Sequence, residues 1–343
     1  MDMDVTNLRS LGSSPLQVNP LSFGGATIGD LWENLDDSFA EGVVRTAYDA
    51  GIRLFDTAPF YGHGLSDYRI GHALRQLPRD SYTISTKVGR WLKPQARHKI
   101  DRGFWLGTLD FESIVDYSYD GIMRSVEQSY QRLATNRLDI LLIHDVDVWS
   151  HGSRELADKY FKQVMDSGYR ALTELRSNGD VKAIGVGVNE ADMCARFAKA
   201  GDFDCMLLAG RYTLYEQTAL EEFLPLCVEK NIGILAGGVF NSGILATGSQ
   251  KDARYNYKEA PAQVVQKVSR IEDVCKRHNV PLAAAAIQFP LGHEKVSSVA
   301  VGMSKPERVQ QCLDLIRHPI PNDLWAELKH EGLLPESAPV PTV

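Results

Sequence analysis

The chain has 343 residues, of which 44% are hydrophobic and 24% charged, and its formal net charge is −7. This composition excludes intrinsic disorder and collagen-like repeats. No apolar run reaches the roughly 18 residues of a membrane-spanning helix. The mild acidity and the lack of basic blocks argue against nucleic acid as a partner. The first residues contain no basic segment followed by an apolar stretch, so we expect no secretory signal.

The number and spacing of the cysteines indicate a reducing compartment. The five cysteines are widely spaced and form no C-x-x-C pair: Cys194, Cys205, Cys227, Cys275 and Cys312. An odd number at such spacing argues against a disulfide framework or a structural zinc site, and we expect a cytoplasmic protein with reduced thiols. The nine histidines form no metal-ligand motif, so we expect no metal.

Short apolar, β-branched runs alternate along the chain with longer segments of helical periodicity. A hairpin is expected over residues 12–18, and strands are expected over residues 21–23, 54–57, 82–88, 138–144, 181–188, 205–208, 233–236 and 298–302. Helical spacing predicts helices over residues 38–50, 117–134, 160–177, 217–230 and 306–316. Gly51 suits the end of the first helix and Pro306 the start of the last. Such continuously apolar strands are typical of parallel strands covered on both faces.

Eight strand–helix units without a break in composition predict one (β/α)8 barrel domain over residues 1–343, with a core of about 16–315. The competing doubly wound sheet needs an early G-x-G-x-x-G fingerprint. Gly185-Val186-Gly187 begins like one, but no third glycine follows at the required place. The proline-containing tail, about 332–343, is expected to be loosely held.

Two connections are too long for plain strand-to-helix loops: residues 89–112 and 145–158. Both leave the carboxyl ends of strands, where barrel active sites are built. We therefore predict substrate contacts from Arg90, Trp91, Trp105 and Asp145. The alternative is that some of these aromatic side chains only pin the loops to the barrel. Further extra length falls in the segment 247–262.

Four polar side chains follow consecutive strands. Asp56 closes the second, Tyr61 follows five residues later, Lys87 closes the third and His144 the fourth. Singly, each also fits a structural ion pair or a satisfied histidine. Together, Lys87 is expected to favour the phenolate of Tyr61 and lower its pKa from about 10. Asp56 would orient Lys87, and His144 would donate to the substrate oxygen. Such a phenol is a general acid/base for carbonyl–alcohol interconversion, and the hydride implies a nicotinamide cofactor.

The order and spacing of these four residues resemble the catalytic tetrad of the aldo-keto reductase superfamily, with a match over about residues 16–315. The segments FGGATIG, DTAPFYG, DILLIHDVD and GGVFNSGIL also resemble one branch of it. That branch holds L-fucose, D-threo-aldose and L-galactose dehydrogenases together with pyridoxal 4-dehydrogenase. The resemblance implies oxidation of a cyclic hemiacetal to a lactone, with Tyr61 as the base on the ring hydroxyl.

The resemblance also implies a dinucleotide site. Its residues would be Gly25, Ala26, Asp56 and Asn189 at the nicotinamide end, the loop Val239-Phe240-Asn241-Ser242-Gly243 at the pyrophosphate, and Lys305 and Arg308 at the adenosine end. The chain departs from the family pattern after the sixth strand, where Ala209-Gly210-Arg211 replaces a common glutamine. It also lacks the Lys-Ser pair of NADP-using relatives. NAD or NADP is expected, with a slight preference for NAD.

The main prediction is thus an NAD(P)-dependent aldose 1-dehydrogenase that acts on a small sugar. Pyridoxal is the rival substrate, because it also forms a cyclic hemiacetal. A non-catalytic regulatory subunit, similar to potassium-channel β-subunits, is the alternative from another class, since a fold does not fix a function. Neither nucleic acid nor a membrane is expected as a partner. Without heptads or an exposed apolar helix, we expect a monomer or a weak homodimer.

Overall fold

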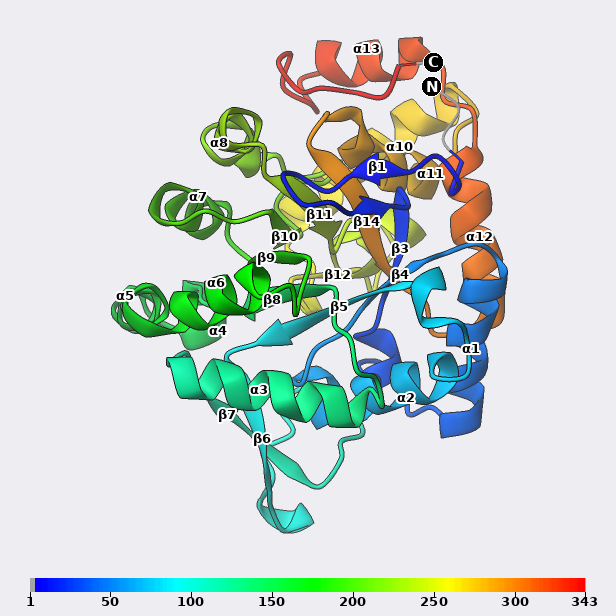
Figure 1. Cartoon of the computed structure of the whole chain (residues 1–343). Helices are drawn as coiled ribbons and strands as arrows, with labels where there is room; N and C mark the ends of the chain where they lie inside the picture. Colours follow the sequence, from blue (N-terminus) through cyan, green and yellow to red (C-terminus); the bar gives the residue numbers. More distant parts are fainter. Residues whose placement is uncertain (1–3, 343) are drawn as a thin grey trace.

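The computed structural model describes residues 4–342, and at their centre eight parallel strands close into a barrel (Figure 1). The strands follow one another around the barrel in chain order: β3 (Leu21–Gly24), β4 (Leu54–Asp56), β5 (Thr83–Val88), β8 (Ile140–His144), β9 (Ala183–Val188), β10 (Cys205–Ala209), β11 (Gly233–Gly237) and β14 (Val296–Gly302). This confirms the predicted (β/α)8 barrel. Because all strands run in the same direction, their carboxyl ends meet at one rim.

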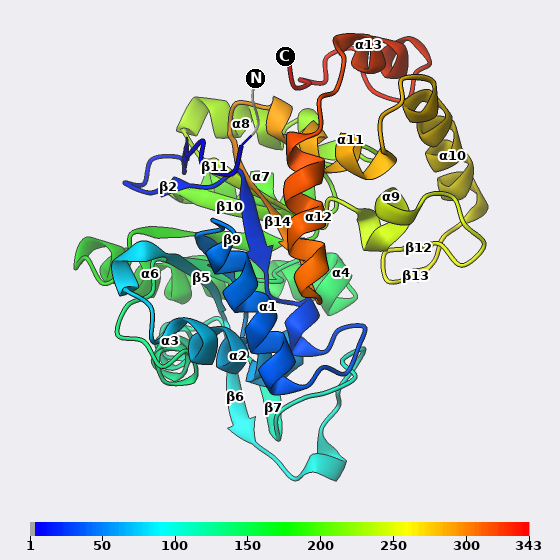
Figure 2. The same cartoon turned by 90° about the vertical axis from the view of Figure 1, so that its right-hand side faces the viewer.

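Helices surround the strands (Figures 1 and 2). They are α1 (Asp37–Asp49), α2 (Leu65–Leu74), α3 (Tyr119–Arg132), α4 (Val148–His151), α5 (Arg154–Gln163), α6 (Tyr169–Ser177), α7 (Ala191–Ala200), α8 (Phe223–Lys230), α9 (Ile244–Thr247), α10 (Ala262–Arg277), α11 (Leu282–Gln288), α12 (Pro306–Arg317) and α13 (Asn322–His330). Pro306 opens α12, and Gly51 follows α1 with a φ of +98°, both as predicted. Within residues 4–342, no helix has the length and apolar character needed to cross a bilayer.

The helical segment predicted over residues 160–177 is not one regular helix. A π-helical turn, Val164–Gly168, lies between α5 and α6. The segment predicted over residues 217–230 likewise begins with a short 3-10 turn and becomes helical only at Phe223. Apolar spacing reports which residues face the barrel, and it does not register a local change in hydrogen-bond pattern.

The predicted N-terminal hairpin closes one end of the barrel. Its strands are β1 (Arg9–Ser10) and β2 (Gln17–Val18). Leu11 and Leu16 between them are buried in one cluster with side chains from the barrel interior, including Leu142 and Leu235. Gly12 lies so close to the barrel that a Cβ there would be 2.0 Å from the carbonyl oxygen of Asp204. With this end plugged, the open end is the rim at the carboxyl ends of the strands.

Two further hairpins belong to the extra length at that rim. β6 (Arg90–Pro94) and β7 (Phe111–Val115) pair antiparallel within the long connection after β5. They project away from the barrel in both views (Figures 1 and 2). The second hairpin, β12 (Arg254–Tyr255) with β13 (Lys258–Glu259), lies within the segment 247–262. The long connections are therefore partly ordered by their own strands.

The prediction of a loosely held C-terminal tail is wrong. Leu333, Leu334 and Ala338 are at most 2% exposed. A Cβ at Gly292 would lie 2.5 Å from the carbonyl carbon of Val340, so the chain packs closely there. The two leucines that follow α13 bury apolar surface, which fixes a segment that its prolines alone would leave extended.

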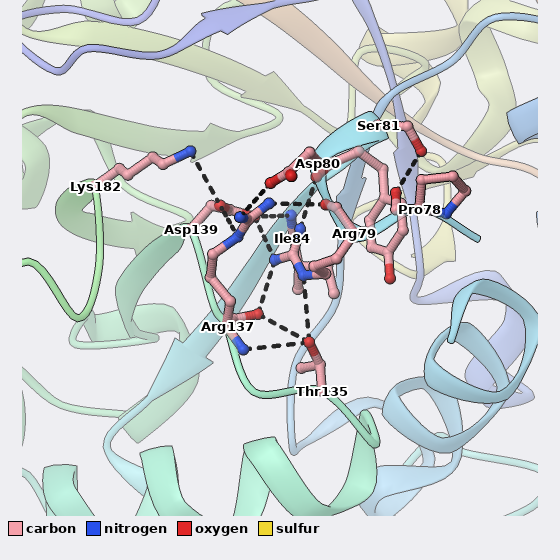
Figure 3. A network of polar contacts seen from close by, with 10 residues as sticks. Pro78, Arg79, Asp80, Ser81, Ile84, Thr135, Arg137, Asp139 and Lys182 are labelled. Carbon is pink, nitrogen blue, oxygen red and sulfur yellow. Dashed lines mark hydrogen bonds and ion pairs between the residues drawn. The ribbon is translucent and has the colours of Figure 1, made fainter. Parts of the chain in front are cut away.

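A buried carboxylate ties the amino-terminal ends of two neighbouring strands together (Figure 3). Asp139, just before β8, is 1% exposed and accepts a hydrogen bond of 2.9 Å from the backbone N–H of Ile84 in β5. Arg79 donates to the same carboxylate at 2.6 Å, and Nε of Arg137 lies 3.4 Å from it. Lys182 adds a longer contact of 3.7 Å. The network fixes the strands at the end opposite the open rim.

Replacing Asp139 with alanine is expected to lower the free energy of unfolding by about 3–5 kcal/mol, because it leaves the Arg79 guanidinium without its buried partner. Urea unfolding followed by circular dichroism measures the change. Asp80→Ala is the matched control, since the Asp80 side chain is 91% exposed and pairs with Arg137 at the surface. It should have a much smaller effect. Equal losses for the two variants would contradict the structural role of Asp139.

All five cysteines are buried and unpaired. Burial raises the pKa of every one of these thiols above its usual value. They occupy different layers. Cys205 lies in the barrel interior cluster, whereas Cys194, Cys227, Cys275 and Cys312 pack between the strands and the helices. Thiols that stay protonated and covered are unreactive in the folded chain.

Candidate active site

Three of the four predicted catalytic residues come from adjacent strands. Asp56 ends β4, Lys87 lies near the end of β5 and His144 ends β8. Nζ of Lys87, a residue that is 1% exposed, donates to Oδ1 of Asp56 at 2.5 Å and to the carbonyl oxygen of Thr57 at 3.1 Å. Ser85 donates to the same Asp56 oxygen at 2.7 Å. The ammonium is thus held in one position at the rim.

Tyr61 reaches the same place from a tight turn. It opens a short 3-10 segment, Tyr61–Gly64, in which Gly62, His63 and Gly64 all have positive φ. A Cβ at Gly62 would lie 2.6 Å from the carbonyl oxygen of Gly29, so only glycine fits there. The Tyr61 ring centroid is 5.7 Å from that of His144 and 5.8 Å from Nζ of Lys87. The structure brings all four predicted residues together.

A buried network holds this turn in place. Thr57 donates to Oδ1 of Asp67 at 2.7 Å, and Arg132 of α3 donates to the other oxygen at 2.9 Å. Ser66 donates to the carbonyl oxygen of Gly25 at 2.8 Å. Because Asp67 is fully buried, its two partners are needed to stabilise it. The start of α2 is thereby fixed to the loops on either side of Tyr61.

The prediction that the pKa of Tyr61 is lowered is wrong. Burial raises the pKa of this phenol well above its usual value of 10, and the negative charges of Asp56 and Asp145 raise it further. The nearby ammonium of Lys87 does not overcome these effects. Tyr61 is therefore protonated at neutral pH, which suits it to donate a proton to a carbonyl. For the reverse direction, the Lys87 ammonium, 5.8 Å from the Tyr61 ring centroid, is a cation placed near enough to favour the phenolate.

His144 is neutral for a related reason. Burial lowers its pKa well below the usual 6.5, and the positive charges of Lys87 and Arg90 lower it further. Its Nδ1 is buried without a hydrogen-bond partner among residues 4–342. Nε2 lies 3.5 Å from Oδ1 of Asp145. A neutral imidazole with unused hydrogen-bonding capacity on a cavity wall is suited to bind a substrate oxygen.

Asp145 is a buried carboxylate beside the tetrad. Its backbone is left-handed, with a φ of +58°, and burial raises its pKa. Arg90 lies 3.3 Å from Oδ2, and Asn189 donates to Oδ1 at 3.3 Å. Aspartate is one of the residues that tolerate this conformation. The structure thus places a buried acceptor next to His144.

These residues surround a cavity at the open rim. The tetrad members Tyr61, Lys87 and His144 line it. The other lining residues are Ala26, Leu31, Phe60, Phe104, Trp105, Asp145, Trp149, Gly187, Val188, Asn189, Leu207, Ala209 and Tyr257. The walls are mainly apolar and aromatic, with a few polar groups near Tyr61.

The predicted substrate contacts fall into three groups. Trp105 and Asp145 line the cavity. Arg90 is behind the wall, where it pairs with Asp145 and its guanidinium lies 4.5 Å from the Phe60 ring centroid. The predicted substrate contact of Trp91 is wrong, because Trp91 does not line the cavity. Side chains alternate along a strand, and Trp91 lies on the face of β6 opposite to Arg90, where Arg124 of α3 stacks on it at 4.5 Å.

The predicted nicotinamide-end residues lie at this cavity or beside it. Ala26 and Asn189 line it, and Gly25 precedes Ala26. A Cβ at Gly25 would lie 2.5 Å from Oγ of Ser66. Asn189 is oriented by Asp147, which accepts from its backbone N–H at 2.7 Å and from its side-chain amide at 3.1 Å. Asn189 therefore presents an ordered amide at the cavity.

The loop after β11, where the pyrophosphate is predicted to bind, has three consecutive residues with positive φ. Asn241, Ser242 and Gly243 have φ values of +44°, +61° and +104°. Oδ1 of Asn241 is buried without a partner in the described chain, and space is open above Gly243. Val239 is buried and Phe240 packs on the core. The backbone N–H groups of Asn241 and Gly243 already donate to the carbonyl oxygens of Gly238 and Phe240 at 2.9 Å, so a pyrophosphate contact in this loop stays a prediction.

The adenosine-end residues lie at the start of α12. Lys305 precedes Pro306, and its Nζ is 3.3 Å from Oε1 of Glu33. Arg308 donates to the side chain of Gln311 at 3.1 Å. Both cationic side chains are exposed, and neither lines the cavity around Tyr61. Lys305 is therefore already neutralised by a carboxylate.

Sequence reasoning missed part of the site. The sequence pattern does not single out Tyr257, a cavity residue in the segment 247–262. A signal for it exists in the pattern RYNYKE, which is a short hairpin with asparagine in the turn. Among residues 4–342, no cluster of three or more His, Cys, Asp or Glu side chains is placed to hold a metal ion.

Comparison with known proteins agrees with this geometry. The model of the Aldo/keto reductase family matches residues 20–330. The chain is 39% identical to pyridoxal 4-dehydrogenase of Microbacterium luteolum, over 97% of this chain and 100% of the relative. It is 40% identical to D-threo-aldose 1-dehydrogenase of a Pseudomonas species, over 93% and 96%. A solved aldo-keto reductase from Bacillus halodurans superposes with a TM-score of 0.74 at 22% identity, covering 96% of this chain and 97% of that one. The chain belongs to the aldo/keto reductase family of NAD(P)-dependent oxidoreductases.

Proposed function

We propose that the protein is an aldose 1-dehydrogenase, which oxidises the anomeric carbon of a small sugar to a lactone. The observation that carries the proposal is the position of Asp145, a buried carboxylate beside His144 on the wall of the cavity that holds Tyr61. A buried carboxylate on the cavity wall is suited to bind a sugar hydroxyl. The similarity to D-threo-aldose 1-dehydrogenase supports the same substrate class.

The residues divide the work as follows. The phenolate of Tyr61 takes the proton of the anomeric hydroxyl. Lys87, fixed by Asp56, stabilises that phenolate before the transfer. Neutral His144 binds the same oxygen and orients it. A nicotinamide cofactor bound beside Tyr61 would supply the acceptor for the hydride from the anomeric carbon. The aromatic walls exclude water around the reacting atoms.

The pH dependence of catalysis follows from the raised pKa of Tyr61. Because oxidation needs the phenolate, kcat/KM for oxidation should rise about tenfold per pH unit from pH 7 toward 10. Reduction of the corresponding lactone or aldehyde needs the protonated phenol, so its rate should be flat over this range. Initial rates in both directions measure these slopes. A plateau of the oxidation rate between pH 7 and 8 would contradict the role of Tyr61.

We propose NAD as the preferred cofactor, held by the loop 239–243 and by Asn189. Glu33 supports this preference, because its carboxylate both neutralises Lys305 and repels a 2′-phosphate placed nearby. Glu33→Gln is expected to increase kcat/KM for NADP⁺ relative to NAD⁺ by a few-fold, a modest effect because the pair is exposed. Lys305→Ala should lower the NADP⁺ rate of that variant again. Unchanged ratios in both variants would argue against this explanation.

Pyridoxal 4-dehydrogenase is the second candidate function, and the aromatic cavity walls favour it. Phe60, Trp105 and Trp149 provide ring faces and edges on which a pyridine can pack. The relative that bears this name is covered over its full length. Its substrate is also a cyclic hemiacetal, so the roles of Tyr61, Lys87 and His144 are the same in both proposals.

A substrate screen tests both candidates. NAD⁺ and NADP⁺ are each combined with L-fucose, L-galactose, D-arabinose and pyridoxal, and formation of reduced cofactor is followed by absorbance. Turnover of the sugars with little turnover of pyridoxal supports the aldose dehydrogenase, and the reverse supports pyridoxal. Cofactor binding without turnover of any substrate would overturn both and favour the regulatory alternative.

We further propose that the chain works as one domain, in the cytoplasm, as a monomer or weak homodimer. Five unbridged thiols suit a reducing compartment. Size-exclusion chromatography with light scattering tests the oligomeric state.

A further inference from the structure

The turn of the β12–β13 hairpin has a backbone conformation that is unfavourable for Tyr257, one of its two residues. Arg254 pairs with Glu259 and Tyr255 with Lys258, which leaves Asn256 and Tyr257 as a two-residue turn. Their φ values are +49° and +63°. Turns of this type prefer asparagine followed by glycine. A tyrosine at the second position is strained, since a bulky side chain rarely adopts positive φ. Strain of this kind points to a function for the side chain.

The Tyr257 ring joins three loops that are far apart in sequence. Its centroid lies 5.7 Å from that of Trp32, 5.6 Å from Phe104 and 5.6 Å from Trp149. These residues follow β3, β6 and β8 respectively, while Tyr257 belongs to the short hairpin beside α9 and α10 (Figure 2). Each of the four side chains is 40–42% exposed. They form a continuous aromatic rim, in which Tyr257 is the member common to all three contacts.

Tyr257 also faces inward. It lines the cavity with Tyr61 and His144, and burial raises the pKa of its hydroxyl, with a further increase from the charge of Asp145. Tyr257 thus lines the cavity while 40% of the residue stays exposed. Among residues 4–342, no side chain or backbone group makes a hydrogen bond with that hydroxyl. The backbone N–H of Tyr257 donates to Oγ of Ser242 at 3.0 Å.

We propose that Tyr257 is a specificity-determining residue that forms the ceiling of the substrate cavity and restricts it to hemiacetals of monosaccharide size. This inference rests on the proposed function. A reducing disaccharide carries the same anomeric hydroxyl as a monosaccharide, so the chemistry at Tyr61 and His144 does not distinguish them. The second sugar ring would have to pass the aromatic rim, and Tyr257 blocks that path. The strained turn is retained because glycine would leave the cavity open.

The test compares Tyr257→Gly with the wild type. Asn-Gly is the favoured sequence for this turn, so the variant removes the ring and relieves the strain together. We expect kcat/KM for a reducing disaccharide such as lactose to rise at least about tenfold relative to the monosaccharide used best by the wild type. Even one methylene group in a pocket changes discrimination by about that factor, and here a whole ring is removed. Tyr257→Phe keeps the ring and should keep the wild-type ratio. Lys258→Ala, an exposed substitution in the same hairpin, controls for effects on hairpin folding.

A second measurement does not need turnover. Acrylamide quenching of tryptophan fluorescence should increase in Tyr257→Gly, because Trp32 and Trp149 lose a covering ring, and it should not change in Tyr257→Phe. Either an unchanged substrate ratio or unchanged quenching in a folded Tyr257→Gly variant would overturn the ceiling. A wild-type enzyme that turns over neither an aldose nor pyridoxal overturns the proposed function instead, and unchanged quenching would then still overturn the ceiling.

Discussion

Replacing Tyr61 with phenylalanine is expected to lower kcat by about 10²- to 10⁴-fold, the contribution of a well-placed general acid/base. The substitution removes one oxygen atom and keeps the ring, whose centroid lies 5.7 Å from the rings of both His144 and Trp105. The cavity shape is therefore preserved, and cofactor affinity should stay near that of the wild type. Steady-state rates measure the first effect, and fluorescence titration with reduced cofactor measures the second.

A matched control for this variant is Tyr68→Phe. Tyr68 is 46% exposed on α2 and stacks on His72, away from the cavity, so its loss should leave the rate unchanged. Near-normal turnover of Tyr61→Phe at neutral pH would remove Tyr61 as the proton-transfer group. A large loss of cofactor affinity would show instead that the hydroxyl acts mainly in binding.

Replacing Lys87 with methionine is expected to affect both rate and stability. The buried carboxylate of Asp56 loses the ammonium 2.5 Å away, and such a broken buried pair costs about 3–5 kcal/mol of unfolding free energy. The rate should fall by about 10²- to 10³-fold, because a preorganised cation is missing when the phenolate forms. The pKa of Tyr61 rises further without this cation, so the rising limb of the oxidation profile moves to higher pH.

The double variant Asp56→Asn/Lys87→Met separates the two effects. It removes the uncompensated charge and should recover much of the lost stability, while the rate stays low because the ammonium is still absent. Chemical denaturation and initial rates on the same preparations test this. Recovery of the rate along with stability would mean that Lys87 acts only through the fold, and an unmoved pH limb would mean that another group sets it.

The convergence of three of the four predicted catalytic residues was predictable because it depends on strand ends. Asp56, Lys87 and His144 each sit where an apolar run stops, and parallel strands in a closed barrel bring those points to one rim. Tyr61 could be placed because its turn contains two glycines within three residues. To predict that residues meet at the rim, only the position of each residue within its strand is needed, and the sequence contains that information.

Features that depend on side-chain direction or on summed electrostatics were not predictable. Trp91 lies in the expected connection, but the pairing of β6 with β7 decides which face it occupies, and that pairing is not visible in an isolated segment. The pKa of Tyr61 depends on burial and on Asp145 as well as on Lys87, so the one contact inferred from sequence gave the wrong direction. Tyr257 was missed because its turn lacks the glycine by which such turns are recognised.

The buried thiols can be used to measure local unfolding of this protein. Ellman's reagent reacts with thiolates, so each cysteine becomes visible only when the layer around it separates. Cys205 in the barrel interior and Cys312 on α12 belong to different layers, and their labelling rates would follow different opening events. A chain with no reactive surface thiol among its five cysteines therefore needs no engineered label. Its local unfolding can be followed, layer by layer, with the residues it already has.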